Sequence, residues 1–237
     1  MSQALRVAVL ASGSGSNLQA LLDRFNARRG APARVELVVA SRAGAGALER
    51  AARAEVVSEV LDVRELGVEA LAERLLGMLE AHRIELVVLA GYLQLVPEVV
   101  VRRFAGRILN IHPALLPAFG GHGMYGMRVH RAVLASGATI SGATVHWVDE
   151  AYDTGRILAQ WPVPVLPGDT PEMLAARVLR VEHLLLPAVV EQIARGGVAT
   201  PPLSEPLTFG LRAEAGPEPF EVRSLAARRL PDQAPEY

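Results

Sequence analysis

Residues 5–28 read LRVAVLASGSGSNLQALLDRFNAR. Residues 5–11 form an apolar run of strand length, serine and glycine follow, and residues 17–28 carry leucine and phenylalanine at helical spacing. The stretch therefore predicts a strand, a tight turn and a helix. Short apolar strands that alternate with amphipathic helices are typical of a parallel sheet covered on both faces.

The same alternation continues along the chain. Further strands and helices are expected at residues 35–40, 46–53, 68–82, 86–90, 107–111, 129–136 and 171–195. Residues 139–148 and 156–163 contain Thr, Val and Trp beside turn residues, which predicts an antiparallel pair. We expect an α/β fold with an open, doubly wound, mostly parallel mixed sheet and a Rossmann-like N-terminal half.

One large domain is expected at residues 1–200, followed by a C-terminal extension at residues 201–237. The extension is rich in Pro, Glu and Arg, so residues 203–209 are expected to add one edge strand and residues 212–237 to be largely tail. The tail is assigned no chemistry.

Charge and composition exclude several function classes. The 24 Lys and Arg nearly balance 25 Asp and Glu, so no overall field attracts nucleic acid or anionic lipid. The chain has no cysteine, and its six histidines show no metal-ligand spacing. No apolar stretch has the length of a signal peptide core or a membrane span. A metal-free cytoplasmic protein, a monomer or homodimer, is the expectation.

The first turn, residues 12–17, is a candidate phosphate cradle. Gly13 and Gly15 let the backbone approach an anion, and free amides before a helix favour negative charge. A bland alternative is a tight turn that only caps the helix. The G-x-G pattern also suggests a dinucleotide site, but Leu18 replaces the third glycine, and Ser41 and Arg42 stand where an acidic ribose ligand is usual. An NADP-dependent oxidoreductase and a non-catalytic nucleotide sensor are therefore kept as alternatives.

A second polar group lies at the end of the strand expected at residues 107–111. Alternation places Asn110 and His112 on one side, at the carboxyl edge where open α/β sheets bind ligands, and Pro113 and Pro117 stiffen the segment after this strand. This favours a functional histidine over a structural one. On spacing alone, Asp153 in the acidic loop 149–155 is an ordinary loop aspartate.

These segments resemble the phosphoribosylglycinamide formyltransferases, folate-dependent enzymes of purine synthesis. The resemblance rests on the turn 13–17, the run Asn-Ile-His-Pro at 110–113 with Leu-Leu-Pro at 115–117, and the loop that ends in Asp153, in that order. Methionyl-tRNA formyltransferases and formyltetrahydrofolate deformylases share the shorter pieces, and the phosphate turn separates them.

The resemblance implies a formyltransferase fold and a set of roles for residues. Asn110, His112 and Asp153 would be catalytic. The phosphate and ribose of 5-phosphoribosylglycinamide would meet Gly13, Gly15, Ser16, Asn17 and Glu182. The co-substrate, 10-formyltetrahydrofolate, would meet Arg64, Leu93, Gln94, Leu95, Val96, Asn110, Asp149 and Asp153. Gln94 departs from the usual Arg, and the Gly-rich loop 119–127 is longer than in many relatives, so it is interpreted as a lid or as a simple loop.

The expected chemistry is attack of an amine on the formyl carbon. The amide of Asn110 and a protonated His112 would stabilise the developing oxyanion, by about 3 to 4 kcal/mol per donor in favourable cases. Asp153 would favour the charged form of His112 and guide a proton from the amine to the folate nitrogen. His146 is expected on a strand that faces this site, and His130 on a helix surface.

Overall fold

The computed structural model describes residues 3–196, 209–212 and 221–224. Its main sheet has seven strands in the order β3-β2-β1-β4-β5-β6-β7. They are β1 (Leu5–Ala11), β2 (Ala33–Ala40), β3 (Val57–Val60), β4 (Leu86–Leu89), β5 (Ile108–His112), β6 (Ile140–Trp147) and β7 (Ile157–Pro164). Neighbours from β3 to β5 pair parallel, and β6 pairs antiparallel with both β5 and β7. The expected mostly parallel mixed sheet is confirmed.

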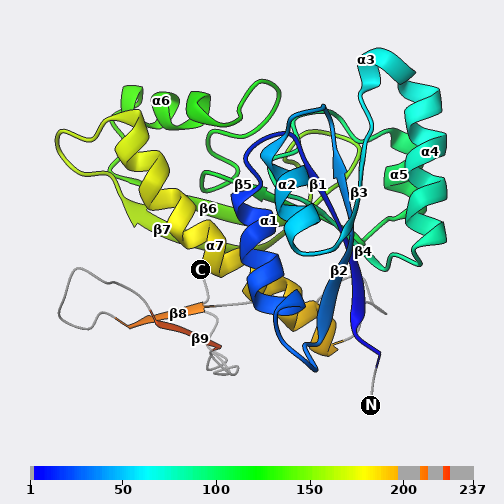
Figure 1. The fold of residues 1–237 in the computed structure, drawn as a ribbon. Helices are drawn as coiled ribbons and strands as arrows, with labels where there is room; N and C mark the ends of the chain where they lie inside the picture. Colours follow the sequence, from blue (N-terminus) through cyan, green and yellow to red (C-terminus); the bar gives the residue numbers. More distant parts are fainter. Residues whose placement is uncertain (1–2, 197–208, 213–220, 225–237) are drawn as a thin grey trace, which may run out of the picture.

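Helices cover both faces of this sheet (Figure 1). One face carries α1 (Ser16–Leu21), the π-helical η1 (Leu22–Asn26), α2 (Gly46–Arg53), α6 (Met127–Ala135) and α7 (Pro171–Gly196). The other carries α3 (Val63–Leu66), α4 (Val68–Ala81) and α5 (Glu98–Arg103). Alternation along β1 supplies both cores, since Val7 and Val9 pack in the first and Ala8 and Leu10 in the second. The sheet is therefore doubly wound, as expected.

The strand order places the ligand site. From β1 the chain adds β2 and β3 on one side, and it then crosses back to add β4 on the other side of β1. The order of strands therefore reverses between the neighbours β1 and β4. Ligands of open α/β sheets bind at the carboxyl ends of the strands beside such a point. Here these ends are the turn after β1, the segment after β4 and the end of β5.

Three local expectations need correction. The helix expected at residues 17–28 is divided, because α1 ends at Leu21 and η1 ends at Asn26, whose side chain exchanges two 2.9 Å hydrogen bonds with the backbone of Val35 on β2. The strand β3 was not anticipated, because it is an edge strand with no buried residue and no apolar alternation. The six-residue α5 was too short to predict from periodicity.

The C-terminal expectation is tested only in part. β8 (Phe209–Arg212) pairs antiparallel with β9 (Glu221–Ser224) in a separate two-stranded sheet, so Phe209 adds no edge strand to the main sheet. Residues 203–208 and the domain boundary at residue 200 lie outside the described residues, and that boundary stays a prediction. Within the described ranges, no helix combines the length and apolar character that crossing a membrane requires.

Candidate active site

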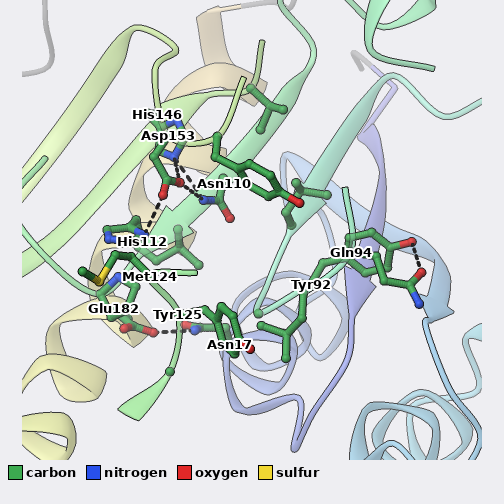
Figure 2. Close-up of a pocket in the computed structure, with 18 of the residues that line it drawn as sticks. Asn17, Tyr92, Gln94, Asn110, His112, Met124, Tyr125, His146, Asp153 and Glu182 are labelled. Atoms are coloured by element: carbon green, nitrogen blue, oxygen red, sulfur yellow. Dashed lines mark hydrogen bonds and ion pairs between the residues drawn. The ribbon is translucent and has the colours of Figure 1, made fainter. Parts of the chain in front are cut away.

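A cavity of about 530 Å³ opens at the carboxyl ends of β1, β4 and β5. Its wall includes the turn before α1, the segment after β4, the Gly-rich loop, the loop after β6 and one face of α7. Figure 2 shows Asn110, His112, His146 and Asp153 gathered at one end, while Asn17 and Glu182 meet at the other. Both polar groups predicted from the sequence therefore share one cavity.

The turn after β1 has its carbonyls occupied and its amides free. The carbonyl oxygens of Ser12 and Ser14 accept hydrogen bonds from the Nε of Arg42 and Arg50, each at 2.8 Å. The amides of Ser14, Gly15 and Ser16 have no acceptor among residues 3–196 or in the two short strands beyond. Unpaired amides beside a cavity form an anion site, so the geometry fits the predicted cradle.

Gly15 is required for this turn to form. Its φ is +72°, and a Cβ at this position would lie 2.7 Å from the Cα of Ala47 in α2. The turn therefore packs directly on the first residues of α2, which leaves its opposite side facing the cavity.

Asn17 and Glu182 form a buried pair beside the cradle. The Nδ2 of Asn17 donates to Oε2 of Glu182 at 2.6 Å, and both residues are less than a tenth exposed. Burial raises the pKa of Glu182, and the hydrogen bond from Asn17 opposes this rise only partly. The Oδ1 of Asn17 is buried without a partner among the described residues. This end thus holds one unused acceptor.

β5 and β6 place four polar side chains on one face of the sheet. Asn110 lies opposite His146, and His112 opposite Thr144. Opposite residues of an antiparallel pair share a face, so the Nδ2 of Asn110 reaches Nε2 of His146 at 3.0 Å. The sequence-based placement of Asn110, His112 and His146 is confirmed.

Asp153 reaches this cluster from the loop after β6. Its φ is +56°, and its Oδ2 accepts from the amide of Gly121 at 2.9 Å. Oδ1 lies 3.3 Å from the Nδ2 of Asn110, and Oδ2 lies 3.5 Å from the Nδ1 of His112. Burial raises the pKa of Asp153, whereas the hydrogen bond from the amide of Gly121, together with His146 and His112 when they carry a proton toward the carboxylate, lowers it below its ordinary value. Asp153 is therefore an ionised carboxylate.

The protonated His112 expected from the sequence needs correction. The side chain is 3% exposed, and burial lowers its pKa more than the charge of Asp153 raises it. Its Nε2 lies 2.9 Å from the carbonyl oxygen of Phe119, which can only accept, so Nε2 carries the proton. His112 rests neutral, and the Nδ1 that faces Asp153 is the atom able to gain a proton.

The amide of Asn110 is also committed. Its Nδ2 contacts both His146 and Asp153, while the Nδ1 of His146 donates to the carbonyl oxygen of Trp147 at 2.8 Å. This arrangement makes Nε2 of His146 an acceptor and uses both N–H groups of Asn110. A formyl oxygen would have to replace or share the longer contact, the one to Asp153.

The cavity brings together most of the residues expected for the folate. Leu93, Gln94, Leu95, Val96 and Asp149 line it. Gln94 accepts a hydrogen bond from the Tyr92 hydroxyl at 3.2 Å, a contact between two neutral side chains. Arg64 does not line the cavity and instead forms an ion pair with Asp62.

Sequence reasoning missed several supporting groups. The carbonyl of Phe119 and the amide of Gly121 orient two catalytic candidates, and main-chain groups carry no sequence signal. Thr144 donates to the carbonyl of Ala114 at 2.6 Å and accepts from the amide of Leu116, which holds the segment after β5. The position of Thr144 opposite His112 could have indicated this role.

His130 was also misplaced. It is 4% exposed, because Val129, His130 and Val133 form the buried face of α6. As for metal ligands, the part of the chain that the structure describes contains no group of three or more His, Asp or Glu side chains suited to a metal ion.

Comparison with known proteins agrees with this geometry. Residues 5–190 match the formyl transferase family. The chloroplastic phosphoribosylglycinamide formyltransferase of Vigna unguiculata is 60% identical over 119 residues, which is 50% of this chain and 38% of that protein. The trifunctional purine biosynthetic protein adenosine-3 of Drosophila pseudoobscura pseudoobscura is 42% identical over 195 residues, 81% of this chain and 14% of that protein.

Two solved structures are similar over more than four fifths of the chain. Glycinamide ribonucleotide transformylase 1 from Symbiobacterium toebii has a TM-score of 0.77 and 39% identity, covering 95% of this chain and 96% of that one. The phosphoribosylglycinamide formyltransferase of Brucella melitensis has a TM-score of 0.74 and 39% identity, covering 84% and 100%.

The curated relatives are longer than the matched region, and the chain spans less than half the length of the first of them. The family match and the solved structures nevertheless agree with the resemblance seen in the sequence. The chain belongs to the formyl transferase family and groups there with the phosphoribosylglycinamide formyltransferases.

Proposed function

We propose that the chain transfers the formyl group of 10-formyltetrahydrofolate to the amine of 5-phosphoribosylglycinamide. The products are N-formylglycinamide ribonucleotide and tetrahydrofolate, as a step of de novo purine biosynthesis. The observation that carries the proposal is one cavity with free turn amides at one end and the Asn110, His112 and Asp153 cluster at the other. A phosphate-bearing amine fits this pairing better than water or tRNA.

The roles follow from the contacts. The turn from Gly13 to Ser16 binds the phosphate, and Asn17 with Glu182 binds the ribose end, where the unpartnered Oδ1 of Asn17 can accept a hydroxyl. The segment of Leu93, Gln94, Leu95 and Val96, together with Asp149, binds the pterin, and Arg64 lies outside as a contact for the glutamate tail.

The reacting groups act in sequence. As the amine attacks, negative charge develops on the formyl oxygen, and the Nδ2 of Asn110 exchanges its contact with Asp153 for that oxygen. Growing negative charge beside His112 raises its proton affinity, so Nδ1 takes up the proton that the attacking amine loses and forms a transient ion pair with Asp153. Asp153 guides the amine proton to the leaving folate nitrogen. The donor is a co-substrate, and no step requires a metal.

The direct test is formylation of 5-phosphoribosylglycinamide by the full chain, followed by absorbance as tetrahydrofolate is released. Product formation that requires both substrates is the expected result. Replacement of the ribonucleotide by water or methionyl-tRNA as acceptor should give no turnover. A folate analogue should raise the melting temperature, and NADPH should not. The opposite thermal shifts would favour the oxidoreductase alternative.

We also propose that the protein is cytoplasmic, acts as a monomer or homodimer, and binds neither nucleic acid nor membranes. The near-zero net charge of −1 supports the absence of a polyanionic partner.

A further inference from the structure

Ser12 begins the turn after β1, yet its side chain does not face the cavity. The residue is 4% exposed and is not part of the cavity wall, which the turn reaches through Ser14 and Ser16. The Oγ of Ser12 instead accepts two hydrogen bonds, from the amide of Leu93 at 2.9 Å and from the hydroxyl of Ser41 at 2.6 Å. The sequence grouped Ser12 with the phosphate cradle, whereas its hydroxyl contacts the segments on either side of the turn.

Ser12 holds the main chain of the segment after β4. The amide of Ser12 donates to the carbonyl oxygen of Gly91 at 3.0 Å, and its Oγ accepts from the amide of Leu93. Within the residues that the structure describes, these are the two hydrogen bonds of the main chain of residues 91–96. Residues 93–96 are the segment that we assign to the pterin. Hydrogen bonding therefore fixes the backbone of this segment at Ser12.

Packing contributes little in the middle of this segment. Tyr92 and Val96 are buried and hold its two ends, but Leu93 and Leu95 between them are 52% and 54% exposed. Both leucines line the cavity. A stretch with exposed side chains depends on its main-chain hydrogen bonds for a fixed position. The bond from the Leu93 amide to Ser12 is therefore what places this part of the cavity wall.

The phosphate turn itself does not depend on the Ser12 hydroxyl. Its carbonyl oxygens at residues 12 and 14 are tied to Arg42 and Arg50, and the carbonyl oxygen of Gly13 accepts from the amide of Ala47 at 3.3 Å. All three are main-chain acceptors, so they would remain if the hydroxyl were removed. Loss of the hydroxyl should therefore loosen the segment after β4 and leave the turn in place.

We infer that Ser12 is a positioning residue for the folate co-substrate and not for the phosphate, an assignment that rests on the proposed function. Its hydroxyl holds Leu93 and so sets the wall against which the pterin binds. A wall that is fixed before binding reduces the entropy that binding must remove. The hydroxyl makes no hydrogen bond to the cluster of Asn110, His112 and Asp153. Its loss should therefore change folate affinity and not the rate of turnover.

The test is Ser12→Ala, with Ser41→Ala as the matched control. Each variant removes one hydroxyl of the same buried pair, but Ser41→Ala keeps the bond between Leu93 and Ser12. Both should lose similar stability to urea. Ser12→Ala alone should raise the Kd for tetrahydrofolate, measured by calorimetry, and the KM for 10-formyltetrahydrofolate, each by about fivefold, the effect of one lost hydrogen bond. Its KM for the ribonucleotide and its kcat should match wild type.

A Kd for tetrahydrofolate within about twofold of wild type in Ser12→Ala would overturn the inference. So would an equal rise in Ser41→Ala, or an equal rise in the KM for the ribonucleotide, since either describes a general loosening. If Ser12→Ala does not fold by circular dichroism, Ser12→Cys, whose sulfur is a weak acceptor, decides by the same measurements. A wild-type protein that binds tetrahydrofolate but formylates no ribonucleotide would instead remove the proposed reaction, and the binding comparison would still decide the role of Ser12.

Discussion

The two ends of the cavity are built in opposite ways. At the phosphate end, the carbonyls of the turn are tied to Arg42 and Arg50, so its amides remain free for a ligand. At the chemical end, Asn110, His112 and Asp153 already satisfy one another and their neighbours. The binding end is ready before substrate arrives, whereas the chemical end must exchange internal contacts for substrate contacts.

Because the two ends differ in this way, we expect the phosphate end to determine substrate affinity and the chemical end to determine the rate of turnover. A cradle of fixed backbone donors binds phosphate without rearrangement, and it binds substrate and transition state alike. The cluster holds its groups in place by mutual contacts, and its 3.3 Å contact between Asn110 and Asp153 is its longest direct hydrogen bond. Changes at the cradle should therefore alter KM, and changes in the cluster should alter kcat.

The largest effect is expected in the cluster. His112→Ala and Asp153→Asn should each lower kcat by roughly three orders of magnitude, because oxyanion stabilisation and proton transfer are lost together. The new amide at position 153 also places a donor near the amide of Gly121. Steady-state kinetics would measure the loss, with the KM for the ribonucleotide nearly constant. Asp23→Asn on the exposed side of η1 is the control, and a tenfold or smaller loss in either cluster variant contradicts the roles.

A smaller and different effect is expected in the cradle. Gly15→Ala adds a Cβ 2.7 Å from the Cα of Ala47 at a φ of +72°, whereas Gly44→Ala meets nothing within 4 Å at a φ of +74°. Both should lose about 1 kcal/mol through the strained φ, and only Gly15→Ala should also displace the turn. The KM for the ribonucleotide should then rise at least tenfold in Gly15→Ala alone, with kcat retained. Equal KM values in the two variants would contradict the assignment of phosphate binding to this turn.

The same contrast explains what the sequence could predict. The β1 turn was predictable because glycine and serine after an apolar strand encode a backbone shape locally. Asn110 and His112 were predictable because strand alternation places both on one face. Asp153 was not predictable from spacing. Its position depends on its own φ of +56° and on Gly155, where a Cβ would lie 1.8 Å from the carbonyl oxygen of Trp147.

His130 shows the limit of helix patterns. The helix α6 was expected, yet which side of it is buried depends on its packing against α7, a contact between segments far apart in sequence. The resting charge of His112 was wrong for a related reason. A nearby carboxylate can be inferred from a resemblance, but the burial that outweighs its effect on the pKa follows only from the packed structure.

The pair of Glu182 and Asn17 is the exception to this contrast, because these two side chains at the binding end are already hydrogen-bonded to each other. Glu182→Gln keeps an acceptor for Asn17 and removes a buried carboxylate whose pKa is raised by burial. A raised carboxyl pKa means that stability is lost as pH rises through the folded-state value. The Gln variant should therefore be more stable than wild type by about 1 kcal/mol at pH 8 and by less at pH 5, measured by urea unfolding.

The same variant should bind the ribonucleotide several-fold more weakly, since the amide group replaces one of the two accepting oxygens of the carboxylate by an NH₂ donor. A gain in stability together with a rise in KM would show that the charge at position 182 is retained for the ligand at a cost to the fold. Unchanged affinity with increased stability would instead assign the ribose end of the site to the unpartnered Oδ1 of Asn17 and to the turn.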